Sequence, residues 1–335
     1  MIYITKLYCS AKTARANHFN QIKASCPPEL KILFISKRSK NDLIYYAKIV
    51  YYLLTHQGQP IYTRDLSLAI LFAFFRRVTC LEIHQIGFIR SQFPHYRFKR
   101  LLFHQFLKSE RTSLVVLTTP AKRVIKRFFN LKDNKVRVIP DAGNFFYTDR
   151  SPYTRGSEKY IGYTGSFEKG KGGIETLQIA SFNKEYKFKT AGQLTSDAQK
   201  IIKQLKNVEH EGYLGQRDLE KFLSNSHILI APASSRVFIG KNDITFYTSP
   251  LKIYQYLFYP VPIIITSSQV NKPLIKVPHV YVVSANSPES DCWPKLFSDL
   301  FEKYSKISPD KIYDDRRPFM YTWKDRLFDM ASRFS

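Results

Sequence analysis

Residues 160–175 of this 335-residue chain read YIGYTGSFEKGKGGIE. The apolar run Tyr160–Thr164 is typical of a buried strand, and a helix is expected to begin at about Gly173. Between them lies a glycine-rich turn, in which the backbone can approach a ligand closely and free N–H groups can bind an anion. Lys169 or Lys171 can add a mobile positive charge. The stretch therefore predicts a phosphate-binding loop, although its spacing fits neither a Walker A loop nor a GxGxxG fingerprint.

A second stretch, residues 248–266, reads TSPLKIYQYLFYPVPIIIT and has the same character. Ser249 is a natural N-cap and Pro250 a natural first helical residue, and an isoleucine-rich strand follows the short helix. The N-terminus of that helix is also suited to phosphate. Two anion-binding helix starts in one domain indicate a diphosphate ligand.

Short apolar runs alternate with longer helical patterns on both sides of these stretches, which predicts an α/β fold with doubly wound parallel sheets. The polar stretch Asp149–Lys159 is the best linker candidate, so we expect two domains and a ligand cleft at the carboxyl ends of their strands. The expected strands are Ile2–Ile4, Lys31–Ile35, Ile61–Tyr62, Thr79–Ile83, Leu114–Thr118, Val136–Ile139, Tyr160–Thr164, Lys187–Ala191, Val208–Glu211, Ile228–Ala231, Pro262–Thr266 and Val280–Val283.

The formal net charge of +25 is concentrated in the first half of the chain. Residues 1–150 contain 26 Lys and Arg against 8 Asp and Glu, whereas residues 151–335 contain 26 against 19. Such a field attracts nucleic acid, anionic lipid or an anionic substrate to the first half. General solubility is the simplest alternative, but it gives no reason for the asymmetry.

A helix expected over Arg97–Arg111 carries part of this charge, and its pattern predicts that it binds a membrane surface. Its basic residues recur at intervals of three and four, which places them on one face of the helix, and apolar residues are assigned to the other side. The alternative interpretation is an ordinary helix face exposed to solvent. The basic set is Arg97, Arg100, His104, Lys108 and Arg111, the apolar set is Phe98, Leu101, Leu102 and Leu107, and a second basic set is Lys122, Arg123, Lys126 and Arg127. No nucleic-acid-binding signature accompanies them, so no nucleic-acid partner is expected.

The cysteines and histidines predict a reduced, cytosolic protein without a structural metal. Cys9, Cys26, Cys80 and Cys292 show no CxxC or zinc spacing, and the eight histidines show no paired ligand spacing. The longest apolar runs fall short of the ~20 residues that cross a bilayer, and no signal-peptide apolar region is expected. We therefore predict a cytoplasmic protein, peripheral on the inner face of the cell membrane.

The two glycine- and proline-containing stretches resemble the donor-binding motifs of glycosyltransferases of the GT-B fold, in particular glycosyltransferase family 4 (group 1). That family has a Gly-x-x-Gly-x…Lys-Gly loop and a later Ser-Pro-Leu-Lys-x-x-Glu-Tyr helix before a Pro-x-hydrophobic strand. The resemblance covers most of residues 55–330. Other segments that match in order are Tyr62–Asp65, Leu81–His84, Val138–Asp141, Val208–Gly215, Leu219–Pro232 and Tyr321–Arg326.

The resemblance implies a retaining, metal-independent hexosyl- or related transferase with two Rossmann-like domains facing a cleft. It places an acceptor-side domain at 1–155, a donor-binding domain at 156–318 and a terminal helix at 319–335 that crosses back to the first domain. A UDP- or GDP-linked sugar would be a substrate. No resident cofactor is expected. The residues implied for the donor are Gly165, Ser166, Lys171, Ser249, Pro250, Leu251, Lys252 and Gln255. Leu251 and Lys252 would act through their backbone amides, and catalytic roles are implied for Lys171 and for His84, which would face the sugar.

Three departures from the family pattern keep a second function open. Ser166 stands where the family often has Arg, Gln255 where a Glu usually holds the ribose hydroxyls, and Pro260 where a Gly is common. The neutral Gln is a weaker acceptor than a carboxylate. We expect a transferase acting on a lipid-linked or cell-surface polysaccharide, with Arg97, Arg100 and Lys108 toward the acceptor and membrane. The alternative is a non-catalytic GT-B-like partner in glycan assembly with a weakened donor site.

Overall fold

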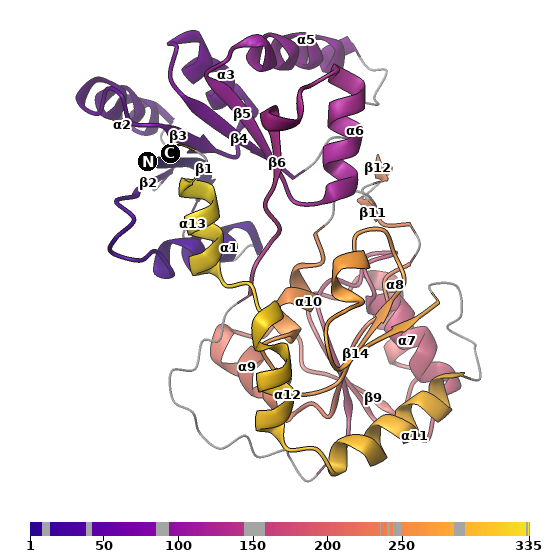
Figure 1. Ribbon diagram of the computed structural model, residues 1–335. Coiled ribbons are helices and arrows are strands. Elements are labelled where there is room, and N and C mark those ends of the chain that lie inside the picture. The colour runs from indigo at the N-terminus through magenta and orange to yellow at the C-terminus, as the bar shows by residue number, and fades with distance from the viewer. Residues whose placement is uncertain are drawn as a thin grey trace. The chain divides into compact units, whose positions relative to one another are not determined.

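The computed structural model divides the chain into two compact units, each described by itself below (Figure 1). Unit 1 comprises Met1–Asp141, Phe246–Ser249 and Thr322–Ser335, and unit 2 comprises Ala142–Thr245 and Pro250–Tyr321. The structure describes residues 1–8, 14–37, 42–84, 94–143, 158–234, 236–239, 242–243, 245, 249–284, 292–332 and 334. The expected linker Asp149–Lys159 lies mostly outside the described residues.

Unit 1 is built on a six-stranded parallel sheet in the order β2-β1-β3-β4-β5-β6. Every residue of β4 and β5 is buried, as is usual when helices cover both faces of a parallel sheet. The strands are β1 (Ile2–Tyr8), β2 (Leu33–Lys37), β3 (Ile61–Thr63), β4 (Thr79–Ile83), β5 (Thr112–Val116) and β6 (Val136–Val138).

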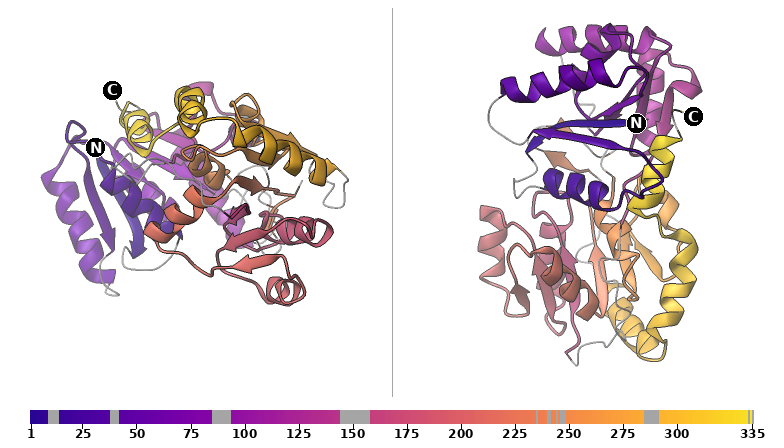
Figure 2. Two further views of the ribbon diagram at one scale, coloured as in Figure 1. Left: turned by 90° about the horizontal axis from the view of Figure 1, so that it is seen from below. Right: turned by 90° about the vertical axis from the view of Figure 1, so that its left-hand side faces the viewer.

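Helices cover the two faces of this sheet unequally. Because parallel crossovers are right-handed, the reversal of strand order at β1 places α1 on one face and α2, α3, α5 and α6 on the other. Figure 2 shows α1 and α2 on opposite sides of the strands, with the C-terminal helix α13 beside α1. The helices are α1 (Ala14–Ala24), α2 (Asp42–Thr55), α3 (Leu66–Phe74), α5 (Pro94–Lys108), α6 (Thr119–Phe129) and α13 (Trp323–Ala331).

Unit 2 repeats this plan with a parallel sheet in the order β14-β13-β10-β7-β8-β9. Alternate strand residues enter two cores, one shared with α7 and α11 and the other with α9 and α10. The strands are β7 (Ile161–Thr164), β8 (Phe188–Ala191), β9 (Val208–His210), β10 (Ile228–Ala231), β13 (Ile263–Thr266) and β14 (Val280–Val283). The helices are α7 (Gly173–Phe182), α8 (Ser196–Ile202), α9 (Gln216–Asn225), α10 (Leu251–Tyr256), α11 (Cys292–Ser305) and α12 (Pro309–Arg316).

The doubly wound α/β class is therefore confirmed, and each of the twelve expected strands overlaps a strand of the structure. The expected strand Leu114–Thr118 is displaced, since β5 already ends at Val116. Thr118 instead caps α6, and its hydroxyl accepts a hydrogen bond from the Ala121 N–H at 3.2 Å. The antiparallel pair β11 (Phe238–Ile239) and β12 (Asn242–Asp243) was not expected, because two-residue strands carry no periodicity.

None of the helices that the structure describes combines the length and apolar character needed to cross a bilayer.

Candidate functional site

The glycine-rich loop of unit 2 joins the carboxyl end of β7 to α7, as predicted, and α7 begins at Gly173. A buried carboxylate holds the loop closed from within. Glu175 accepts hydrogen bonds from the N–H groups of Gly170 and Gly172, at 3.0 and 2.9 Å. Gly172 has φ +103°, a conformation that favours glycine. The loop is therefore preorganised before any ligand binds.

The side chain of Lys252, from the first turn of α10, reaches into this loop. Its Nζ donates to the Tyr163 hydroxyl at 2.7 Å and to the Lys171 carbonyl at 2.8 Å, and lies 4.1 Å from the centre of the Tyr163 ring. A Cβ at position 165 would come within 2.8 Å of the same Nζ, so glycine at Gly165 makes room for the amine. Two segments more than 80 residues apart thus meet at one cation.

The described part of the chain supplies this amine with no counterion of its own. Among the described residues no carboxylate lies within ion-pair distance of it, and its two hydrogen-bond partners are neutral oxygens. Burial lowers the pKa of Lys252 to about 7, which the nearby Glu175 carboxylate opposes and the Lys171 cation reinforces. An anionic ligand would provide the missing charge, so the arrangement is suited to phosphate.

Lys171, predicted as the mobile cation of the loop, lies at the loop but forms an ion pair with Glu168. Its side chain is 24% exposed and Glu168 is 46% exposed, so water weakens this pair. The Ser166 hydroxyl accepts from the Glu168 N–H at 3.2 Å and stabilises the turn. Sequence reasoning assigned Lys252 a role only through its backbone amide, although the Ser-Pro-Leu-Lys motif contains this side chain.

The prediction for the start of α10 was wrong. Ser249 is not the N-cap: the cap position is Pro250, without a side-chain hydrogen bond, and the helix proper begins at Leu251. Proline has no N–H and no polar side chain, and Ser249 is buried without a partner for its hydroxyl in the described structure. Because α10 has six residues, its dipole is small compared with the charge of Lys252.

Gln255, predicted at the ribose, lies on α10 and is half-buried. Its side-chain amide donates to the Tyr259 hydroxyl at 3.4 Å. The amide oxygen that would accept from a ribose hydroxyl is therefore oriented by a neighbour four residues further along the chain.

In unit 1, His84 follows the carboxyl end of β4 and is held by two charged neighbours. Its Nε2 faces the Glu82 carboxylate, and its Nδ1 accepts from the Arg64 guanidinium at 3.0 Å. Burial lowers the pKa of His84, the Arg64 charge lowers it further, and Glu82 opposes both. The imidazole is thus neutral, with the proton on Nε2 and a fixed orientation.

Glu82 is the centre of a wider buried cluster. The guanidinium of Arg326, on the C-terminal helix α13, donates to Glu82 at 3.0 Å and to the Pro140 carbonyl at 2.7 Å, and the Tyr62 hydroxyl also donates to Glu82. Burial by itself would raise the pKa of Glu82, but the charge of Arg326, the hydrogen bond from His84 and the charge of Arg64 outweigh it and hold the pKa well below its usual range. The cluster fastens α13 to β4.

The basic helix of unit 1 differs from its prediction in two ways. Helix α5 ends at Lys108, so Arg111 does not belong to its face, and Phe98 and Leu101 are exposed beside the cations. The residues of α5 that are buried in the core are Phe103, Phe106 and Leu107, and they define the inner face of the helix. Arg97 and Lys108 are exposed and Arg100 is half-buried.

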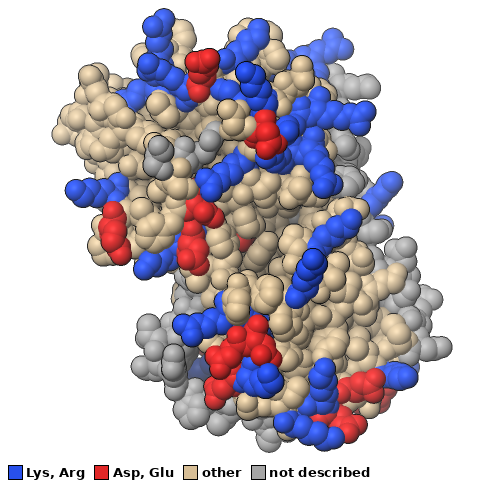
Figure 3. All heavy atoms as spheres, viewed as in Figure 1, with Lys and Arg blue, Asp and Glu red and all other residues tan. Residues whose placement is uncertain are grey.

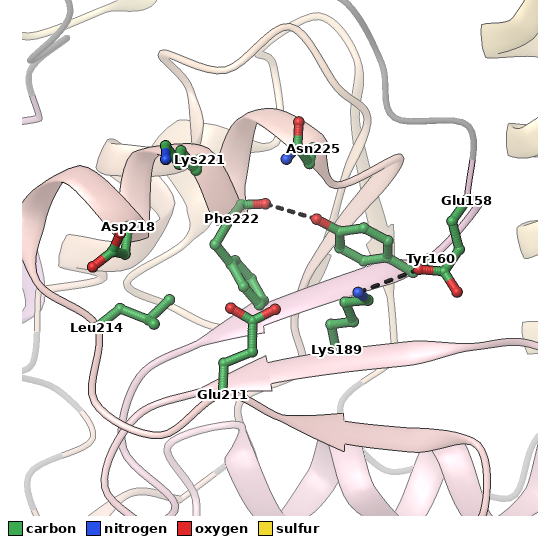
Figure 4. A pocket seen from close by; sticks show the side chains of 9 residues that line it. All are labelled: Glu158, Tyr160, Lys189, Glu211, Leu214, Asp218, Lys221, Phe222 and Asn225. Atoms are coloured by element: carbon green, nitrogen blue, oxygen red, sulfur yellow. Dashed lines mark hydrogen bonds and ion pairs between the residues drawn. The ribbon is translucent and has the colours of Figure 1, made fainter.

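A hollow of about 430 Å³ in unit 2 contains none of the predicted donor residues (Figure 4). It lies between α9 and the strands β7 to β9, where the Tyr160 hydroxyl donates to the Phe222 carbonyl at 3.1 Å. Lys189 in its wall is paired with Glu158 at 3.2 Å and with Glu209 at 3.3 Å. Since carboxylates line it as well, the hollow is not an anion site like the loop.

Among the described residues, no group of three or more His, Cys, Asp or Glu side chains is clustered as metal ligands would be.

No protein-family model matches the chain, and no curated protein matches it. Solved structures do. A glycosyltransferase from Rickettsia africae is 14% identical over 99% of this chain and 97% of its own, with a TM-score of 0.67. HepE of Anabaena, solved in complex with UDP, is 10% identical over 99% and 98%, with a TM-score of 0.65. WaaG, a glycosyltransferase involved in lipopolysaccharide biosynthesis, is 13% identical over 99% and 98%, with a TM-score of 0.57.

These similarities establish the fold. The chain has the GT-B architecture of two Rossmann-like units, as expected from its motifs. Membership of glycosyltransferase family 4 stays a prediction, as do the roles of the site residues.

Proposed function

We propose that the protein is a retaining glycosyltransferase of hexosyl or related type that uses a nucleoside-diphosphate sugar. The observation that carries this proposal is the Lys252 amine, which is enclosed at a preorganised glycine loop and whose hydrogen-bond partners in the described part of the chain are neutral. The GT-B fold and the donor motifs of the sequence support it. UDP is the first nucleotide to test, because the similar HepE structure contains UDP.

The chemistry of glycosyl transfer fits the loop. The bond from C1 of the sugar to the diphosphate oxygen breaks through a cationic transition state, while negative charge builds on the leaving diphosphate. Donors placed in advance at that charge lower the barrier most. Lys252 would meet the diphosphate directly, assisted by the N–H group of Ser166, and Lys171 would add charge after leaving Glu168. This set would neutralise the diphosphate without a metal ion. The Gly165 N–H, which the sequence also offered, already donates to the Ala191 carbonyl at 2.9 Å.

His84 would serve as a fixed surface for the donor sugar. Both ring nitrogens already have partners in Glu82 and Arg64, so the ring is poorly placed to remove a proton. A neutral, oriented imidazole can instead contact a sugar without changing charge. We assign unit 1 to the acceptor, a lipid-linked or cell-surface polysaccharide.

The basic helix α5 supports action at an anionic membrane on the cytoplasmic side. Arg97 and Lys108 are exposed, and the half-buried Arg100 lies between them on the helix. Reversal of all three charges should release the protein from vesicles that contain phosphatidylglycerol at low salt. Unchanged binding would remove α5 from the membrane contact and leave the donor chemistry standing.

The second candidate is a non-catalytic partner in glycan assembly with a weakened donor site. Two observations favour it: Ser166 contributes a turn-capping hydroxyl in place of a cation, and Gln255 contributes an amide in place of a carboxylate.

A melting-temperature panel with UDP, GDP, ADP and CMP, with and without EDTA, separates the two candidates. A ligand at about 100 times its dissociation constant adds about 2.7 kcal/mol, which raises the melting temperature by a few degrees. A rise with one nucleoside diphosphate that persists in EDTA and shrinks to about half or less in Lys252→Met is the expected result. Should none of the nucleotides shift the wild-type protein, the non-catalytic function becomes the better one.

A further inference from the structure

The outer face of α2 is unusually apolar for a surface helix. From Ile44 to Thr55 eight residues are exposed, and Lys48 is the one charged residue among them. Val50, Tyr51 and Leu54 are 53%, 61% and 66% exposed. The inner face of the same helix packs Tyr45 and Ile49 into the core. The helix is therefore apolar on both sides, and only one side is covered by the described protein.

The end of α3 extends this surface. Phe74 is 80% exposed and Phe75 is 58% exposed, and both stand at the helix end. The Arg77 guanidinium, just beyond them, donates to the carbonyls of Leu53 at 2.9 Å and His56 at 2.7 Å. These bonds tie the end of α3 to the end of α2. The exposed side chains of the two helix ends thus belong to one rigid surface.

The rest of the described chain shows that this is a local property. Of the 19 large apolar side chains that are exposed, 13 belong to unit 1. Helix α9 of unit 2 exposes only polar side chains, which are Gln216, Arg217, Asp218, Lys221 and Asn225. Single exposed apolar residues need no explanation, but a group of large ones indicates a surface that meets an apolar partner.

Charge decides which partner fits. Residues 42–143 contain 17 Lys and Arg against 6 Asp and Glu. In Figure 3 basic side chains gather over α5 and α6, while tan surface covers the region of α2. Two copies of the chain that met through these faces would bring like charges together, whereas an anionic bilayer supplies both an apolar interior and neutralising headgroups.

We propose that the outer face of α2 and the end of α3 insert into an anionic lipid bilayer. This α2–α3 apolar face comprises Ile44, Val50, Tyr51, Leu54, Phe74 and Phe75. The helix would lie in the plane of the interface, with Lys48, Arg76 and the cations of α5 at the headgroups. This inference names the surface that would contact the membrane in the proposed function, and its biological meaning rests on that function. Its test does not depend on the proposed function.

Vesicle sedimentation of the full chain tests this assignment. The vesicles contain phosphatidylcholine alone, or phosphatidylglycerol and phosphatidylcholine at about 1:2. The wild-type protein should bind the anionic vesicles and stay bound in about 0.5 M NaCl, where charge attraction is screened but apolar insertion is not. Phe74→Ser/Phe75→Ser should bind about 100-fold more weakly at that salt, because two apolar side chains are lost.

Matched variants make each outcome decisive. Phe182→Ser, at a position in unit 2 that is 57% exposed, should bind like the wild type. Tyr51→Ser/Leu54→Ser should repeat the loss from the other helix, with melting temperatures unchanged in all three variants. Equal binding of wild type and Phe74→Ser/Phe75→Ser at high salt, or no vesicle binding at all, would overturn the proposal. So would a wild-type dimer in gel filtration that this variant converts to monomer, since the face would then meet a second copy.

The same proteins separate this inference from the proposed function. Lys252→Met should bind nucleotide about 10- to 100-fold more weakly and keep vesicle binding. Phe74→Ser/Phe75→Ser should keep nucleotide binding and lose vesicle binding at high salt. If no nucleotide binds the wild-type protein or its variants while the wild type binds vesicles, the proposed donor chemistry is wrong. The membrane role of the α2–α3 apolar face is then still supported.

Discussion

The two units of this protein treat buried charge in opposite ways. In unit 1 the Glu82 carboxylate is surrounded by Arg326, Arg64 and His84, so this buried charge has its counterions within the fold. In unit 2 the Lys252 amine is held by a hydroxyl and a carbonyl, without a carboxylate in ion-pair distance among the described residues. The charge of Glu82 is therefore neutralised when the protein folds, whereas the charge of Lys252 is neutralised only when an anion binds.

The difference indicates that the Glu82 cluster serves stability and that the Lys252 site serves binding. A closed cluster stabilises the position of a strand end and a helix, and little is gained from it when a ligand arrives. An uncompensated cation costs free energy in the empty protein, and that cost is recovered as affinity when an anion binds. Variants in the two clusters should therefore have opposite signatures.

The largest expected effect is on stability in unit 1. Glu82→Gln keeps the size of the side chain but leaves the fully buried Arg326 guanidinium without its carboxylate. Loss of one partner of a buried pair costs about 3–5 kcal/mol in the free energy of unfolding. Urea titration of the full chain measures it. The double variant Glu82→Gln/Arg326→Met should recover much of the loss, and a single-variant loss below about 1 kcal/mol would mean that the cluster behaves like an exposed pair.

Lys252→Met should lower nucleotide affinity and raise stability together. Hydrogen bonds to a charged group contribute about 1.5–3 kcal/mol, so affinity should fall by about 10- to 100-fold. Calorimetry with the nucleotide that shifts the wild-type melting temperature measures the first effect, and thermal melting at neutral pH measures the second.

Lys171→Met is the matched control for that variant. Its ammonium has Glu168 as a partner, so its loss should affect nucleotide affinity less and should not raise stability. A larger loss of affinity from Lys171→Met than from Lys252→Met would return the main role to Lys171.

The pH dependence sharpens the same contrast. The pKa of Lys252 is lowered from 10.5 to about 7 in the fold, so the unfolded chain holds more protons between these values and stability rises with pH across that window. Nucleotide affinity should fall over the same range, because the free amine loses its charge above pH 7. Lys252→Met should abolish both slopes, and an affinity that does not vary from pH 7 to 9 in the wild type would contradict a role for the charged amine.

The smallest expected effect is a gain of affinity in Gln255→Glu. A carboxylate at this position accepts hydrogen bonds from ribose hydroxyls more strongly than the amide does. We expect affinity for the nucleoside diphosphate to rise several-fold, with no change in affinity for inorganic pyrophosphate, which has no ribose. A parallel rise for pyrophosphate would place the effect outside the ribose site.

The positions of the strands were largely readable from the sequence. Thr79–Ile83 and Ile228–Ala231 match β4 and β10 residue for residue, because strands covered on both faces favour apolar residues at successive positions. Val280–Val283 matches the edge strand β14 equally well, although none of its residues is fully buried, because its valines favour extended backbone. Strand ends next to helix caps were less readable, since Thr118 satisfies both patterns. The cap of α10 was mistaken for the same reason: Ser249 has the right chemistry for a cap, but the backbone turns one residue later at Pro250.

The sequence by itself determined the class of fold and the glycine loop of this protein, because apolar runs, glycines and caps act between residues that are near one another in the chain. Only the tertiary structure decided which charges meet: Lys252 reaches the loop of Lys171, and Arg326 reaches Glu82 from 244 residues away. It also decided that α2 turns one apolar face outward, which no periodicity distinguishes from a face in the core. Such pairings depend on the packing of whole sheets and helices, and burial then sets the pKa of each group and the use to which it is put.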